Sequence, residues 1–176
     1  MTTFTVTTLS DSGTGSLREA ISLAEAAPGA DEIVFAEGLA GVMRLQSTLN
    51  ITTQLSIDGD TDGDGRADVV ISGDADGDDP TRQDLFGRTV SDAFAHTDAS
   101  LVDNIRPFEL AGPGADATLS NLVITGGGTW DGAAIDGNGG AVRVEEASTL
   151  RMEGMSLVGN VALNGGAVHF GGALFG

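Results

Sequence analysis

The chain has 176 residues, 26 of them acidic and eight basic, and its formal net charge is −18. A surface this negative repels nucleic-acid phosphates and anionic lipid headgroups, so we expect neither nucleic-acid binding nor membrane insertion. The absence of cysteine excludes disulfides, thiolate metal sites and cysteine nucleophiles. Apolar residues make up 40% of the chain, which is enough for one core, and the length suits a single domain over residues 1–176.

The first forty residues predict a strand and a helix. Residues 3–9 alternate apolar and polar side chains, which indicates a strand. Ser16 and Glu19 have the spacing of a capping box, in which a hydroxyl and a carboxylate bind the free amides at a helix start. Apolar residues follow at spacings of three and four up to a Pro-Gly step, so a helix is expected over 16–27. We interpret residues 1–40 as an N-terminal cap.

Short apolar runs bounded by Gly, Asp or Asn follow the predicted helix, and their length suits strands. They occupy residues 41–72 and residues 108–176. The segment between them, 73–107, is polar and rich in aspartate, so we expect a long acidic insertion loop there. In the second region the triplet Gly-Gly-Ala occurs at 139–141 and again at 165–167, which indicates an internal repeat.

A repeat of about two dozen residues with short strands and Gly or Asn turns favours one architecture among all-β folds. The prediction is a right-handed parallel β-helix, a solenoid with an N-terminal capping helix and one long inserted loop. The helix would cover the open hydrophobic end, as terminal caps do in repeat proteins. A β-sandwich of regular hairpins is the alternative, and it is less favoured because two-residue Asn-Gly turns between long alternating strands are scarce.

Three segments resemble known families. TLSDSGTGSLREAISLAEAAPGADEIVF, residues 8–35, looks like the N-terminal cap of bacterial surface-exposed right-handed β-helix proteins, although Gly15 stands where that family often has cysteine. Residues 157–160 and 165–168 are similar to the repeats of polymorphic outer-membrane proteins, with leucine replacing an aromatic residue. IDGDTDGDGRADVVISGD, residues 57–74, resembles acidic segments of calcium-binding repeat proteins secreted by type I systems. The resemblance implies an extracellular architecture rather than a particular activity.

The densest chemical signal is an aspartate-rich loop that follows a predicted strand. Its carboxylates stand at loop positions 1, 3, 5 and 9 around a turn-forming glycine, and a backbone carbonyl stands at position 7, as in a calcium loop. Position 12 is Ile71 and not the bidentate Glu of an EF-hand, so two flanking helices are not expected. The predicted ligands, which are hard oxygen atoms that favour Ca²⁺, come from Asp58, Asp60, Asp62, Asp64, Arg66 and Asp68.

The same pattern recurs in part fourteen residues later. Residues 57–64 align with residues 71–78, so Asp74, Asp76 and Asp78 are predicted to form a second loop that shares ions with the first. The alternative is that these aspartates are only a solvated acidic surface, as in proteins from saline habitats. Half of the aspartates lie within 58–79, however, whereas a general surface adaptation would scatter them.

These observations predict a calcium-binding structural or adhesive module located outside the cell or on its surface. The start of the chain lacks the basic and apolar regions of a signal peptide, so type I-like export is expected. Exposed strand edges and apolar ends such as Phe170 and Phe175 predict self-association through the C-terminal end, and extracellular matrix or polysaccharide is a further expected contact. The alternative is a calcium-dependent polysaccharide lyase or a glycoside hydrolase, with Arg143 or Arg151 as the candidate base.

Overall fold

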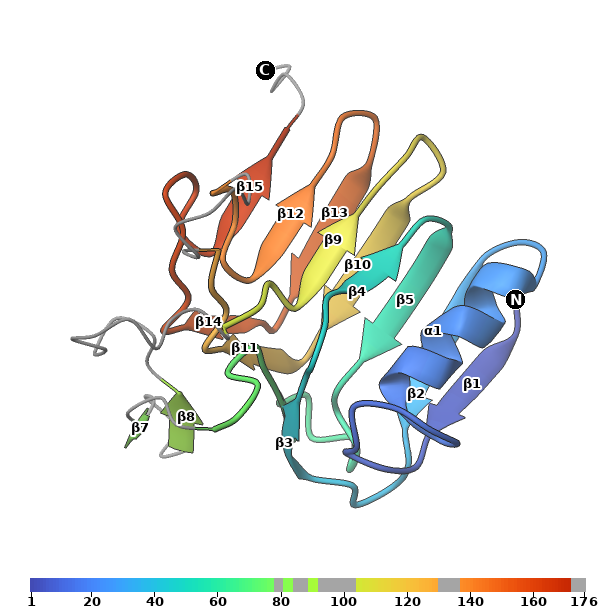
Figure 1. Cartoon of the computed structure of the whole chain (residues 1–176). Helices are drawn as coiled ribbons and strands as arrows, with labels where there is room; N and C mark the ends of the chain where they lie inside the picture. The colour runs from blue at the N-terminus through green and yellow to red at the C-terminus, as the bar shows by residue number, and fades with distance from the viewer. Residues whose placement is uncertain (78–80, 84–88, 92–103, 130–136, 172–176) are drawn as a thin grey trace.

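The computed structural model describes the chain except for residues 78–80, 84–88, 92–103, 130–136 and 172–176 (Figure 1). One parallel sheet contains β1 (Thr3–Val6), β2 (Asp31–Phe35), β5 (Gln54–Asp58), β10 (Asp116–Ser120) and β13 (Thr149–Glu153), in that order. A second contains β3 (Gly41–Arg44), β6 (Val69–Ser72), β11 (Leu122–Thr125) and β14 (Ser156–Val158). A third contains β4 (Leu49–Ile51), β9 (Phe108–Leu110), β12 (Val142–Val144) and β15 (Val168–Phe170).

Helix α1 spans Leu17–Ala26, one residue shorter at each end than the sequence predicts. The Ser16 hydroxyl accepts a hydrogen bond from the backbone amide of Glu19, and the Glu19 carboxylate accepts one from the amide of Gly15 at 2.5 Å. The helix stops where Ala27 becomes extended, because the residue before a proline is disfavoured in the helical region. One apolar face of α1 packs against β1, β2 and β4.

The chain visits the three sheets in turn. Strands β2, β3 and β4 enter the first, second and third sheets, and the later strands repeat this order, so each strand pairs in parallel with a strand from the next passage. The pairing between β12 and β15 joins Val142 to Val168 and Val144 to Phe170, an offset equal to the separation of the two Gly-Gly-Ala triplets. Strand order therefore follows the spacing of the apolar runs along the chain.

The core lies among the inward-facing side chains of all three sheets and α1. In the five-stranded sheet, Ile33, Ile57 and Leu119 occupy one row of register partners, and each is fully buried. The rows are filled mostly by Val, Ile, Leu and Ala, which explains how a chain with few aromatic residues closes a core. Where buried and less buried residues alternate along a strand, this alternation determines which side chains enter the core.

The predicted fold class, an all-β right-handed parallel β-helix, is corrected by this architecture. The parallel strands form three small separate sheets of five, four and four strands, and a helix packs on the first of them, which is an α/β-type arrangement. Period-two patterns identify strands and their buried faces, but the division of those strands among sheets depends on backbone hydrogen bonds between residues far apart in sequence. The local sequence pattern does not specify those long-range hydrogen bonds.

The acidic segment 73–107 contains secondary structure as well as irregular chain. Strands β7 (Thr81–Gln83) and β8 (Thr89–Ser91) form an antiparallel pair within it. Asp74 also forms an antiparallel bridge with Asn104, so the two ends of the segment meet beside the sheets. The insertion expected over 73–107 thus contains an antiparallel strand pair in its described part.

Candidate metal centre

The aspartate loop connects β5 to β6 and closes on itself at its base. The amide of Asp68 donates to the carbonyl of Gly59 at 3.1 Å, and the amide of Gly59 donates to the carbonyl of Ser120 at 3.0 Å. A Cβ atom at position 59 would lie 2.3 Å from the carbonyl oxygen of Asn121, so only glycine allows this approach between neighbouring chain segments. The loop thus leaves the sheets from a fixed base and projects outward.

Asp60 organises the interior of the loop. Its carboxylate accepts backbone hydrogen bonds from Gly63 at 2.7 Å, from Gly65 at 2.8 Å and from Asp62 at 3.2 Å. Both glycines have positive φ angles, of 82° and 78°, which turn their amides toward this carboxylate. The hydrogen bond from Gly65 is the largest cause that holds the pKa of Asp60 below its usual value of 3.8, so the ionised form is favoured.

Three carboxylates converge in the loop. Asp60, Asp62 and Asp68 each offer an oxygen atom, and these atoms all lie within 4.8 Å of one another. One oxygen of Asp68 accepts hydrogen bonds from the amide and the hydroxyl of Thr61, both at 2.8 Å, which fixes the orientation of that carboxylate. Like charges at this separation repel one another unless a cation lies between them. The group could therefore hold a metal ion.

The other predicted ligands of the first loop have different partners. Asp64 accepts from the amide of Arg66 at 2.9 Å, and the Arg66 guanidinium lies 4.0 Å from its second oxygen. Asp58 accepts from the amide of Asp60 at 3.1 Å and from the side-chain amide of Asn121 at 3.0 Å. The first loop thus divides into three converging carboxylates and two that support the surrounding backbone. Ligation by the Arg66 carbonyl stays a prediction.

The second predicted loop shares the backbone device of the first. Asp74 accepts from the amide of Gly77 at 2.8 Å, as Asp60 does from Gly63, and Gly77 also has a φ of 82°. Asp74 is buried and Asp76 is exposed, whereas Asp78 lies outside the described residues. Among the described residues the converging carboxylate group comes from the first loop, and a shared ion stays a prediction.

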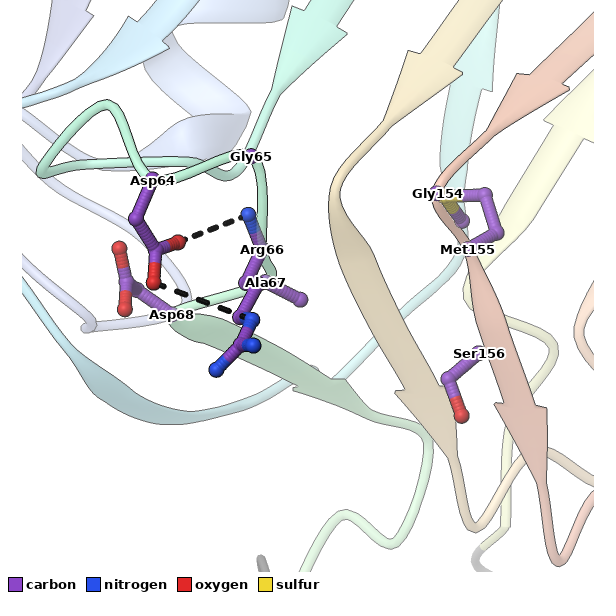
Figure 2. Close-up of a pocket in the computed structure, with 8 residues that line it drawn as sticks. All are labelled: Asp64, Gly65, Arg66, Ala67, Asp68, Gly154, Met155 and Ser156. Atoms are coloured by element: carbon purple, nitrogen blue, oxygen red, sulfur yellow. Dashed lines mark hydrogen bonds and ion pairs between the residues drawn. The ribbon is translucent and has the colours of Figure 1, made fainter. Parts of the chain in front are cut away.

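A cavity of about 490 Å³ lies against one side of the first loop (Figure 2). Asp64, Arg66 and Asp68 line one wall, and Met155 and Ser156, from the turn and strand after β13, line the other. Figure 2 shows Asp64, Arg66 and Asp68 on one side and Met155 and Ser156 on the other, with a further strand passing between them in this view. Asp68 therefore belongs both to the converging carboxylates and to the lining of the cavity.

Sequence reasoning missed two residues that build the site. Thr61 orients Asp68 through its amide and hydroxyl, and its place at the second loop position was the available signal. Asn121 holds Asp58 and takes a left-handed conformation, with φ of 49°, between β10 and β11. Asparagine tolerates that conformation better than most residues, but its contact with the loop is long-range and left no local signal.

The two arginines considered as bases for polysaccharide cleavage lie in different surroundings, and that alternative stays a prediction. The Arg143 guanidinium makes ion pairs with Glu109 at 3.3 Å and with Glu145 at 3.2 Å. Arg151 lies on the exposed side of β13, where it lines a second cavity of about 290 Å³ together with Asp31 and Asp116, and it has no ion-pair partner among the described residues. Arg143 is thus engaged by Glu109 on the neighbouring strand β9 and by Glu145, which directly follows its own strand β12.

No family model, curated protein or solved structure matches this chain. Among the described residues, no helix has both the length and the apolar character needed to cross a membrane.

Proposed function

We propose that the chain is a calcium-binding structural module, with its ion in the loop between β5 and β6. The observation that carries the proposal is the convergence of Asp60, Asp62 and Asp68 in a loop whose backbone is already organised. Three carboxylates supply hard oxygen ligands and no nitrogen or sulfur, which favours Ca²⁺ or Mg²⁺ over zinc. An irregular loop with access to water suits Ca²⁺ better, because Mg²⁺ demands near-ideal octahedral geometry.

The structural role follows from where the loop is placed. The loop joins β5 of the first sheet to β6 of the second. Its base contacts the segment between β10 and β11 through Gly59 and Asn121. An ion that fixes this loop would therefore fix the junction between β5, β6 and β10. Calcium is abundant outside cells and scarce inside them, so we propose an extracellular or surface location, where such a module would make structural or adhesive contacts.

Calorimetric titration with CaCl₂ tests the proposal directly. We expect one binding event in the unmodified protein and its loss in Asp62→Asn, which removes one of the converging charges but keeps the side-chain shape. Asp116→Asn is the matched control, because Asp116 is an exposed carboxylate on β10 outside the group. No heat of binding at millimolar Ca²⁺, or equal binding by Asp62→Asn, would contradict the proposal. A parallel titration with MgCl₂ shows whether the loop prefers the larger ion.

A further inference from the structure

At one end of the three parallel sheets, no further described strand lies beside the last strands. Strands β13, β14 and β15 are the last in their sheets, and each pairs with one neighbour only among the described residues. At the other end, α1 packs over β1, β2 and β4. The open edges present unpaired backbone amides and carbonyls, which are the groups that recruit another strand.

The same end carries exposed apolar side chains. Met152, Leu163 and Phe170 are 38%, 65% and 45% exposed, and all three lie on or between the last strands. In the five-stranded sheet Met152 continues the row of Ile57 and Leu119, both fully buried. Met152 is therefore a core-facing residue whose outer side is covered by no strand of the described residues.

The charge of this end decides which partner fits. Residues 147–176 contain one arginine, Arg151, and one acid, Glu153, so their formal charge is zero in a chain whose net charge is −18. A second copy of this chain is repelled by most of the surface but not by this end. Neither Arg151 nor Glu153 has an ion-pair partner among the described residues, and both point to the outer face of β13, away from Met152.

We propose that two copies of the chain pair edge to edge through β13, antiparallel, about a two-fold axis at Met152. In that register Met152 lies opposite Met152 of the second copy, and Arg151 of each copy lies opposite Glu153 of the other. The symmetric contact closes after two copies, because the same patch is used on both. The contact provides two cross-strand ion pairs and extends the apolar row that ends at Met152. It also gives hydrogen-bond partners to the unpaired backbone groups of β13. This inference goes beyond the calcium proposal and does not rest on it.

Cysteine cross-linking tests the register. The chain has no cysteine, so Met152→Cys introduces the only thiol. Opposite residues of an antiparallel pair have Cβ atoms roughly 4.5–5.5 Å apart, near enough for a disulfide after small adjustment. Val42→Cys is the matched control, because Val42 is 37% exposed and lies on β3, at the other edge. We expect a covalent dimer from Met152→Cys under mild oxidation and none from Val42→Cys, and equal cross-linking of both would overturn the register.

Charge reversal tests the ion pairs in the cysteine-free protein by sedimentation from micromolar to millimolar concentration. Arg151→Glu should weaken dimerisation about tenfold or more, because symmetry turns two attractive pairs into two repulsive ones. The double variant Arg151→Glu, Glu153→Arg should restore it, whereas a merely unfolded variant would not be rescued. Arg44→Glu is the control for net charge. A protein that stays monomeric throughout, or an Arg151→Glu variant that dimerises normally, would refute the proposal.

Discussion

Removing calcium should lower the thermal stability of this protein by an amount that linkage predicts. In the loop between β5 and β6, three carboxylate oxygens lie within 4.8 Å of one another, so the folded chain offers a cation a site that the unfolded chain cannot assemble. At a free Ca²⁺ concentration of about 100 times Kd, such a ligand adds about 2.7 kcal/mol to the free energy of unfolding.

The expected change in melting temperature follows from the length of the chain. For domains of this size, 1 kcal/mol corresponds to about 2–4 °C in Tm, so chelation should lower Tm by about 5–11 °C. Scanning calorimetry with Ca²⁺ and with EGTA measures the shift. Asp62→Asn in Ca²⁺ should melt near the chelated protein, and Asp116→Asn should keep the full shift.

Two outcomes would refute this reasoning. Equal Tm values in Ca²⁺ and EGTA would indicate that the three carboxylates are only part of a solvated acidic surface. A full calcium shift in Asp62→Asn would show that an ion binds elsewhere. Asp64→Asn then distinguishes the three converging carboxylates from the larger ligand set that the sequence predicts. The contacts of Asp64 with Arg66 predict that the calcium-dependent Tm shift persists in this variant, whereas the sequence pattern predicts that most of the shift is lost.

Three further outcomes are expected. Backbone hydrogen bonds, first that of Gly65, lower the pKa of Asp60 in the folded protein. In EGTA, the unmodified protein should therefore be more stable to urea than Asp60→Asn above pH 3.8, and this difference should shrink as the pH falls through the lowered pKa. Gly59→Ala should lower Tm more than Gly114→Ala, because the added Cβ would lie 2.3 Å from a backbone oxygen at position 59 and 3.1 Å from one at position 114. Leu119→Ala should cost about 2–5 kcal/mol in chemical denaturation because Leu119 is fully buried, and an equal cost for the largely exposed Leu163→Ala would contradict this.

The helix and most strands could be predicted because their signals are local. The Ser16 and Glu19 capping pair, the apolar spacing after it and the Pro-Gly stop all act within one or two helical turns, and α1 ends within one residue of the expected limits. The strands likewise show alternating burial that the sequence pattern predicts.

The candidate site was predictable in part. The spacing of Asp60, Asp62 and Asp68 around two glycines brings them together through bonds inside the loop. The same spacing placed Asp58 and Asp64 in the ligand set. In the structure, Asp58 accepts a hydrogen bond from Asn121, a residue sixty-three positions away, and Asp64 accepts one from the backbone amide of Arg66. Loop spacing alone does not show which aspartates converge, and ligation by Asp58 and Asp64 stays a prediction.

The sequence by itself determined the local elements of this protein, its acidic character and a loop able to gather carboxylates. Only the tertiary structure decided the fold class, the three separate sheets and the packing of α1 against the first. It also decided that β13, which carries Arg151, Met152 and Glu153, pairs with one strand only among the described residues. The physical reason is range: capping, alternation and turn chemistry act between near neighbours, whereas sheet partners and exposed edges depend on hydrogen bonds and packing between residues far apart in the chain.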